Sequence, residues 1–350
     1  MDENGLGMAT GSHLAGLAAL LVALVISLAL GRRVIATMAG LGVGQRVRDD
    51  GPQRHLQKEG TPTMGGVLIV GATVLATVLA VAVWGRSSFA SVGLGAALPL
   101  VATLTLGAVG FADDWLKVKR GRSLGLKARQ KLLYQFVAAI VTLLVGQAFL
   151  LVLPRASATP SPGLVVSVGA LGGVLVSVLL LVFTSNAVNL ADGLDGLATG
   201  LCTVAAAGFT VLAWHSGEMG VAVFGLALMG ACLGFLWFNR HPARIFMGDV
   251  GSLALGGALA AMAIALGSPL ALIGLCLVPF LEAASVIIQV IFFKTTGKRV
   301  FKMSPIHHHF ELCGWSERRV VGTFWAVQLV AAIATVALLL AVPSLLRWPL

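Results

Sequence analysis

The chain has 350 residues, of which 58% are hydrophobic and only 11% are charged. Soluble domains contain about 25% charged residues, so this composition excludes a water-soluble enzyme and predicts an integral membrane protein. The formal net charge is +10, but the basic residues gather in short stretches between apolar runs, which argues against a nucleic-acid-binding protein. The 43 glycines suit close packing of helices in lipid.

The first apolar run has no basic region before it and no clear cleavage site. We interpret it as a retained membrane span and not as a signal peptide. The four cysteines include no CxxC pair, so the sequence indicates neither a zinc site nor a disulfide framework.

A membrane-spanning helix needs about 20 mostly apolar residues. By this criterion the sequence predicts an all-α polytopic membrane protein with about ten transmembrane helices, forming a single domain over residues 1–350. The predicted spans cover residues 12–30, 64–84, 91–112, 131–153, 163–184, 197–214, 219–238, 252–267, 270–292 and 321–342.

The basic residues predict how the chain is oriented in the membrane. If the ten spans alternate, 21 of the 24 lysines and arginines fall on one side. The other side receives only Arg86, Arg155 and Arg347. By the positive-inside rule, the basic side is cytoplasmic and both termini lie on the outer, periplasmic side.

Five aspartates lie at the predicted cytoplasmic ends of spans or just beyond them. They are Asp113, Asp114, Asp192, Asp195 and Asp249. Acidic residues at a membrane edge are costly unless they are paired, hydrated or bound to metal. Solvated helix ends would explain any one of them, but five on one face, within polar clusters, favour a functional site.

Asp113 and Asp114 are followed by Lys117, which a helix would bring within reach of both carboxylates. One interpretation is an ordinary ion pair at a helix end. Adjacent carboxylates repel each other, however, so the pair also favours a divalent cation or a protonated partner.

Asn189, Asp192 and Asp195 are spaced by three, so a helix would place them on one polar stripe. Their oxygen atoms suit Mg²⁺ or sugar hydroxyls, and the alternative is a polar loop with turn glycines.

Asp249 stands between glycines where the chain re-enters the membrane. It is interpreted either as a cap on the eighth span or as a site residue.

Three consecutive histidines follow a helix-start signal, with Ser304 as the N-cap and Pro305 as the first helical residue. His307, His308 and His309 then lie in the first turn, where free N–H groups favour an anion. With lysines and arginines nearby, this pattern indicates a phosphate-handling surface. A zinc site is the weaker alternative, because consecutive histidines cannot all face one ion from a helix.

Two further features leave their roles open. Lys58 and Thr63 precede the second span and could contact phosphate, or could belong to a simple Gly/Pro turn before a helix. Glu282 lies inside the predicted span 270–292, where an acid is a functional candidate. The sequence names no partner for Glu282, and a structural role is an equal alternative.

Taken together, five motifs closely resemble those of the phospho-N-acetylmuramoyl-pentapeptide transferases (the MraY or translocase I family), a branch of the polyprenyl-phosphate N-acetylhexosamine-1-phosphate transferases. They are GTPTMGG, FADDWLK, NAVNLADGLDGLA, FMGDVGS and SPIHHHFE, in the family's order. The resemblance covers about residues 44–340, and the histidine segment favours the muramoyl branch over the GlcNAc-1-phosphate branch. It implies ten spans, a homodimer, and a Mg²⁺ site on the cytoplasmic face of the bacterial inner membrane, opening to a lipid groove.

The resemblance also implies a reaction, the transfer of phospho-MurNAc-pentapeptide from UDP-MurNAc-pentapeptide to undecaprenyl phosphate, giving lipid I and UMP for peptidoglycan synthesis. It implies catalytic roles for Asp113, Asp114, Asn189, Asp192, Asp249 and His307, with Asp249 as the Mg²⁺ ligand. It implies substrate-binding roles for Lys58, Thr63, Lys117, Lys131, Asp195, Asn239, Phe246, His308 and His309. Among these, Lys58, Asp195 and Asn239 would contact the nucleoside, Phe246 would stack on uracil, and Asp113 with Asp114 would handle the lipid phosphate. The basic stretch 127–131 aligns with the family in more than one register, and Lys131 is the lysine chosen from it.

Phosphoryl transfer depends on charge neutralisation and in-line positioning more than on covalent chemistry. The acceptor phosphate is a monoester with a second pKa of about 6, so it is mostly dianionic near neutral pH. We therefore expect direct attack, with Asp113 removing any residual proton; a covalent phospho-aspartate is the rival mechanism. A sister transferase that uses UDP-GlcNAc and a transporter are the alternative functions, although a transporter would place polar groups near the middle of the bilayer.

Overall fold

The computed structural model describes residues 3–42, 44, 58–84, 89–121, 124–152 and 168–345. These residues form helices and no β-strand beyond an isolated bridge, which confirms the predicted all-α class. Ten of the helices are long and apolar enough to cross a membrane, as predicted. They are α1 (Glu3–Gly40), α2 (Gly66–Trp84), α3 (Phe89–Arg120), α4 (Ala128–Val152), α5 (Val168–Ala191), α6 (Leu197–His215), α7 (Met219–Asn239), α8 (Gly248–Ala265), α10 (Leu277–Thr296) and α12 (Glu317–Ala341). The short elements are α9 (Ala271–Leu275), α11 (Ile306–Leu312) and a 3₁₀ turn at Pro343–Leu345.

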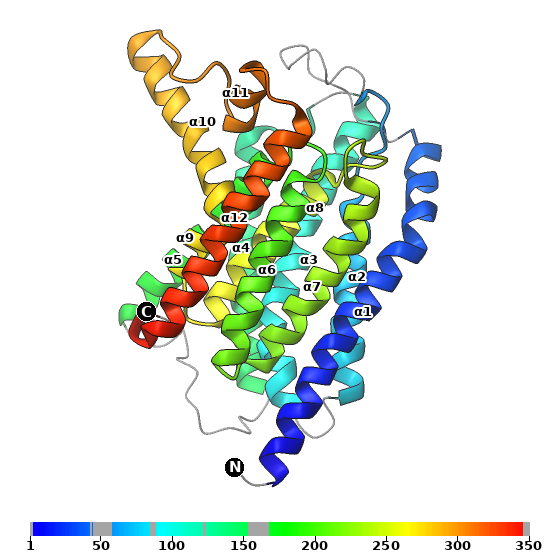
Figure 1. Cartoon of the computed structure of the whole chain (residues 1–350), viewed down its shortest axis with the longest axis vertical. Helices are drawn as coiled ribbons and strands as arrows, with labels where there is room; N and C mark the ends of the chain where they lie inside the picture. Colours follow the sequence, from blue (N-terminus) through cyan, green and yellow to red (C-terminus); the bar gives the residue numbers. More distant parts are fainter. Residues whose placement is uncertain are drawn as a thin grey trace.

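Helices α7 and α8 are the most enclosed. Helix α7 packs on α1 and α6, whereas α8 packs on α3 and α5 (Figure 1). In the most apolar 18-residue stretch of each helix, 83% of α8 is buried inside the molecule, compared with 22% of α12. The outer helices expose many Leu, Val, Ile and Phe side chains, which suits contact with lipid tails and not with water.

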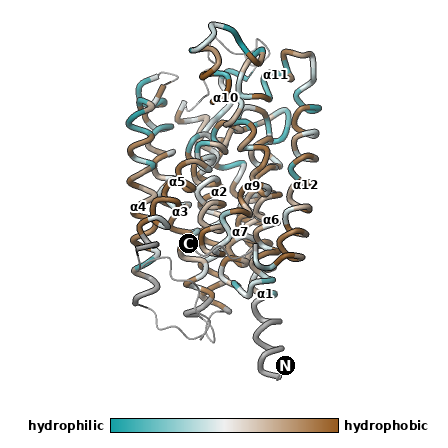
Figure 2. Tube along the Cα trace, turned by 90° about the vertical axis from the view of Figure 1, so that its left-hand side faces the viewer, coloured by the Kyte–Doolittle hydropathy of each residue, from teal (hydrophilic) through white to brown (hydrophobic). Residues whose placement is uncertain are grey.

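The polar residues concentrate at one end of the bundle. Figure 2 shows hydrophilic segments gathered around α11 and the adjoining helix ends, above a largely hydrophobic middle. The beginning of α1 and the end of α12 both lie at the opposite end (Figure 1). An even number of membrane spans places both of these ends on the same side of the membrane.

Several predicted boundaries were wrong because helices continue through polar residues beyond the predicted spans, as α1 does to Gly40. Helix α3 continues to Arg120, α5 continues to Ala191, and α8 begins already at Gly248. Backbone hydrogen bonds satisfy the main chain, so an apolar criterion underestimates a helix whose last turns bear functional polar groups. The predicted start of the fifth span, at residues 163–167, lies outside the described residues. So do the arginines Arg46, Arg48, Arg54, Arg86, Arg122, Arg155 and Arg347.

The predicted polar stripe of Asn189, Asp192 and Asp195 was also wrong. Only Asn189 is helical, because α5 ends at Ala191 and a turn follows. That turn ends at Gly196, whose φ of 76° is left-handed and favours glycine. The three side chains are therefore presented by a helix end and a turn.

The predicted span 270–292 is interrupted between α9 and α10. Backbone groups freed by such a break need partners, since lipid offers none. Gln328 of α12 supplies them: its Oε1 accepts from the Val278 N–H at 3.0 Å, and its Nε2 donates to the carbonyls of Gly274 at 3.1 Å and Leu275 at 2.8 Å. Apolar patterning cannot reveal an amide inserted from a helix about 50 residues away.

Candidate functional site

Asp113, Asp114 and Asp249 form what we call the acidic cluster. Helix α3 carries the first two and the first turn of α8 carries the third, and one carboxylate oxygen from each lies within 4.8 Å of the others. The helices meet this closely because Gly110 packs on the backbone of Asp249; a Cβ on Gly110 would come 2.1 Å from the Asp249 carbonyl oxygen. Asp113 and Asp114 are both 2% exposed.

Two lysines compensate part of this negative charge. The Lys117 Nζ lies 2.7 Å from Asp113 Oδ2, 3.1 Å from Asp114 Oδ1 and 2.7 Å from Asp249 Oδ2. This confirms the predicted reach of Lys117 to both aspartates of its own helix. Lys131 of α4 places its Nζ 2.9 Å from Asp249 Oδ2.

Asn189, near the end of α5, joins the same network. Its Nδ2 donates to Asp249 Oδ1 at 2.6 Å and to Ser252 Oγ at 2.8 Å, while its Oδ1 accepts from Lys131 Nζ at 3.4 Å. Four helices, α3, α4, α5 and α8, therefore supply one continuous set of charged and amide groups.

The donor set of the acidic cluster fits a hard divalent cation. Carboxylate and amide oxygens are the ligands that Mg²⁺ prefers, and three carboxylate oxygens already lie within mutual reach. No histidine or cysteine among the described residues belongs to this cluster, which suits Mg²⁺ better than zinc. The residues present thus fit the predicted Mg²⁺ site at Asp249.

A second group, which we call the Lys58 cluster, comprises Lys58, Asp195, His241 and Glu317. The Lys58 Nζ lies 2.7 Å from Asp195 Oδ1 and 2.6 Å from Glu317 Oε1. The His241 Nδ1 lies 3.0 Å from Asp195 Oδ2 and 3.3 Å from Glu317 Oε2. Sequence patterns alone indicated no role for His241 or Glu317. An acid in the first turn of a helix is common, so Glu317 gave no distinct signal.

Asp192 lies in the turn between the two clusters. It is partly buried, and this burial, together with the negative charges of Asp249 and Asp114, raises its pKa well above the usual value for aspartate. A cation bound nearby would oppose that shift. The turn thus places a further acidic residue between the Lys58 cluster and the acidic cluster.

His307 lies against this same turn. Its side chain is 1% exposed, and a Cβ on Gly193 would come 2.2 Å from its Nε2. The predicted start of this helix was one residue early, since the N-cap of α11 is Pro305 and not Ser304. Pro305 has extended backbone with a ψ of 166°, so it precedes the helix.

The other two histidines contact their own segment. The His308 Nδ1 lies 2.9 Å from Glu311 Oε2, and the His309 Nδ1 accepts from the backbone N–H of Lys302 at 3.1 Å. The His307 and His308 rings remain close, with centroids 4.1 Å apart, whereas the His309 ring packs against Phe301 and Phe310.

Asn239 and Phe246 bracket the loop between α7 and α8. Asn239 is 2% exposed; its Oδ1 accepts from Thr199 Oγ1 at 2.8 Å, and its Nδ2 donates to the Ile245 carbonyl at 2.9 Å. The Phe246 N–H donates to the Pro62 carbonyl at 2.8 Å, which ties this loop to the segment before α2. The buried Asn239 side chain thus stabilises the loop by a hydrogen bond to its backbone, while Phe246 is partly exposed.

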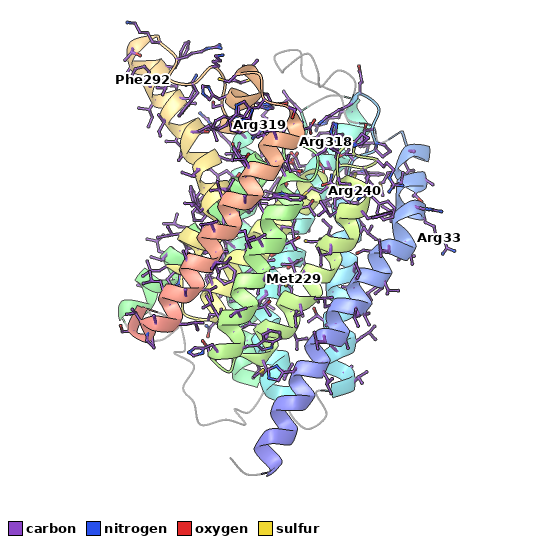
Figure 3. All side chains as sticks on the ribbon, in the orientation of Figure 1. Arg33, Met229, Arg240, Phe292, Arg318 and Arg319 are labelled. Atoms are coloured by element: carbon purple, nitrogen blue, oxygen red, sulfur yellow. The ribbon has the colours of Figure 1, made fainter. Side chains whose placement is uncertain are left out.

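Thr63 lies at the edge of the acidic cluster. A Cβ on Gly248 would come 3.0 Å from Thr63 Oγ1 and 2.4 Å from Asp114 Oδ2, so both side chains flank the start of α8. Figure 3 places Arg240, Arg318 and Arg319 at this same end of the bundle, whereas Met229 lies in its middle. These cationic side chains therefore share one end of the bundle with the acidic groups, and the guanidinium groups of Arg240 and Arg319 stack on Trp237 and Trp315.

Comparisons with known proteins identify the family of this chain. Residues 96–267 match the model of glycosyl transferase family 4, and residues 58–70 match signature 1 of the phospho-N-acetylmuramoyl-pentapeptide-transferases. Curated relatives carrying the name phospho-N-acetylmuramoyl-pentapeptide-transferase come from Bacillus mycoides (strain KBAB4), Bacillus thuringiensis (strain Al Hakam) and Bacillus cereus (strain AH187). Each is 48% identical over 314 residues, covering 89% of this chain and 94% of the relative. The chain therefore belongs to the family of phospho-N-acetylmuramoyl-pentapeptide transferases, which are membrane enzymes of peptidoglycan synthesis.

Proposed function

We propose that this enzyme transfers phospho-MurNAc-pentapeptide from UDP-MurNAc-pentapeptide to undecaprenyl phosphate, giving lipid I and UMP. It acts as a single transferase domain within a homodimer, with the site on the cytoplasmic face of the bacterial inner membrane and both termini outside. The observation that carries the proposal is the meeting of the acidic cluster, Lys117, Lys131 and Asn189 at one end of the bundle. A transporter would instead concentrate such groups at mid-membrane.

The acidic cluster, with Asp249 foremost, would hold Mg²⁺, which when bound neutralises charge on the donor diphosphate and on the leaving UMP. Lys117 and Lys131 exchange some of their carboxylate contacts for phosphate oxygens. Asp113 and Asp114 orient the acceptor phosphate, and Asp113 takes any proton that it still carries. The acceptor then attacks the sugar-linked phosphorus directly, and the bond to UMP breaks.

The Lys58 cluster would bind the uridine end of the donor. Lys58 and Asp195 contact the nucleoside and Phe246 stacks on uracil, while Asn239 acts by holding the loop that presents Phe246. Asp192 and His307 stand between this end and the acidic cluster, where the diphosphate must lie. Thr63, His308 and His309 would add hydrogen bonds to phosphate or sugar at the rim.

The decisive experiment supplies purified enzyme with radiolabelled UDP-MurNAc-pentapeptide, undecaprenyl phosphate and Mg²⁺. We expect UMP release and a labelled lipid product, and neither with UDP-GlcNAc as the donor. A product from UDP-GlcNAc alone would reassign the chain to the sister transferases. Uptake of label into vesicles without UMP release would indicate a transporter.

A second assay separates direct attack from a covalent intermediate. With donor and labelled UMP but no undecaprenyl phosphate, direct attack predicts no exchange of label into the donor. Exchange, or a phosphorylated enzyme trapped with donor alone, would show that a phospho-aspartate forms.

Cys313 offers a test of orientation, because it is exposed beside α11 whereas Cys202, Cys232 and Cys276 are buried. We expect a membrane-impermeant maleimide to label the protein in inside-out vesicles and not in right-side-out vesicles. Cys313→Ser should abolish the labelling. In that background, His215→Cys, at the exposed end of α6, should show the reverse pattern. Labelling of Cys313 from the outside would invert the proposed topology.

Glu317 should affect donor binding more than turnover, because it holds Lys58 in place from 2.6 Å away. Hydrogen bonds to charged groups contribute about 1.5–3 kcal/mol, so Glu317→Ala should raise the KM for the UDP donor by at least about tenfold. The kcat should stay within about threefold of the unchanged enzyme, as expected for lost ground-state binding. Glu59→Gln, an exposed acid beside Lys58, is the matched control and should leave KM unchanged. A fall in kcat with constant KM would place Glu317 in the chemical step.

A further inference from the structure

Glu282 is an acidic residue of α10, and its side chain has 0% exposure. The structure supplies the partner that the sequence could not name. Its Oε2 lies 3.1 Å from the Nδ1 of His307 and accepts from the backbone N–H of His307 at 3.4 Å. The carboxylate therefore meets both the ring and the main chain of one residue of α11.

His307 stands between this carboxylate and the turn that joins the two clusters. Its Nε2 packs against Gly193, the neighbour of Asp192, on the side of the ring away from Nδ1. Neither ring nitrogen completes a hydrogen bond with the described residues, nor does Oε1 of Glu282, although all three atoms are buried. Buried polar groups in this state are costly. Nδ1 already has Glu282 Oε2 beside it, whereas Nε2 points to a partner that the described residues do not provide.

We propose that Glu282 is a positioning residue for the transfer reaction, acting through His307. The Glu282 carboxylate engages Nδ1 and the backbone, so that the ring is fixed and Nε2 is the atom presented to a phosphate oxygen of the donor. In a histidine, the partner of one ring nitrogen sets the role of the other. The inference rests on the proposed function, because the donor diphosphate is the group that Nε2 would meet.

A purely structural role for Glu282 is the rival explanation, in which it only fastens α11 to α10. The two explanations differ in what depends on His307. If Glu282 acts through the ring, Glu282→Ala should have little further effect on kcat in a variant that already lacks the His307 ring. If it only supports the fold, its removal is equally harmful with or without the ring.

The kinetic test is a double-mutant cycle on the full-length enzyme in detergent. Misplacing a catalytic group by about 1 Å can reduce turnover about 100-fold, so Glu282→Ala should lower kcat on that scale with the donor KM within about twofold. Glu282→Gln keeps an oxygen for Nδ1 and should recover at least about tenfold of the loss. In the His307→Ala background, Glu282→Ala should lower kcat by less than about threefold further. Ser285→Ala, one turn along α10, removes a buried hydroxyl that bonds to the Glu282 carbonyl, and should leave kcat nearly unchanged.

Equal losses in both backgrounds, or a lower melting temperature with a raised KM, would overturn the proposal. A second readout needs no turnover: nitrogen NMR of histidine-labelled enzyme, with the His307 signal identified from His307→Ala. We expect one dominant form protonated at Nδ1 in the unchanged enzyme and a mixture in Glu282→Ala. The same spectrum in both would refute the inference even if the donor proves to be a different nucleotide sugar. An unchanged enzyme that makes no lipid product would count against the proposed function alone.

Discussion

Asp249→Asn is expected to lower turnover at least about 1,000-fold, the scale seen when a central charged group of a catalytic set is removed. Asp249 is the point where Lys117, Lys131 and Asn189 meet, at 2.6 to 2.9 Å from its carboxylate oxygens. The substitution keeps the shape but removes the negative charge that the two ammonium groups share. It also removes the proposed Mg²⁺ ligand. Lipid I formation, measured over a range of Mg²⁺ concentrations, is the readout.

The matched control is Glu59→Gln, which removes one negative charge from an exposed position in the segment before α2. It should retain nearly full activity, because surface charges contribute little. If Asp249→Asn kept more than a tenth of the normal turnover, the acidic cluster would not be the centre of the reaction. If Asp114→Asn were far more damaging than Asp249→Asn, the metal ligand would be misassigned.

Gly193→Ala is expected to lower kcat about 100-fold or more, although only one methyl group is added. The new Cβ would stand 2.2 Å from Nε2 and 2.7 Å from Cε1 of the buried His307 ring, so the ring or the turn must shift. Displacing a catalytic group by about 1 Å is sufficient for a loss of this size. Steady-state kinetics should show the effect, and the thermal unfolding curve shows whether the protein remains folded.

Gly322→Ala provides the comparison, since a Cβ at that glycine of α12 meets nothing within 4 Å. An alanine in a helix is favoured over glycine by about 1 kcal/mol, so this variant should be at least as stable and fully active. Full activity of Gly193→Ala would mean that the position of His307 does not matter for turnover.

The sequence predicted the all-helical class and the ten spans because a bilayer imposes strict length and hydropathy on any helix that crosses it. It also predicted the contact of Lys117 with Asp113 and Asp114, because all three lie on one helix. Contacts of this kind depend only on local geometry. The motifs indicated the family for a different reason, namely their resemblance to known sequences.

Long-range pairing was not predictable from local patterns. Glu282 and His307 are 25 residues apart, and Lys58 and Glu317 are 259 residues apart. Their contacts depend on how α10, α11 and α12 pack, which apolar runs do not specify. The break between α9 and α10 was missed for the same reason, because the amide of Gln328 that stabilises it comes from another helix.

Asn239 shows a subtler limit of motif reasoning. The resemblance implied that it contacts the nucleoside, yet both ends of its amide bond within the protein, to Thr199 and to the Ile245 carbonyl. A residue can contribute to binding by shaping a loop as well as by touching the ligand, and a motif does not distinguish these two roles.

Residues from separate helices are proposed to form one site that holds a divalent cation together with the donor diphosphate. The most direct test of this proposal is electron paramagnetic resonance of Mn²⁺, substituted for Mg²⁺, in the enzyme with bound UDP-MurNAc-pentapeptide. We expect phosphorus hyperfine coupling from the diphosphate, which is lost in Asp249→Asn and kept in Glu59→Gln. Mn²⁺ bound without any phosphorus coupling, or coupling that is unchanged in Asp249→Asn, would contradict the proposal.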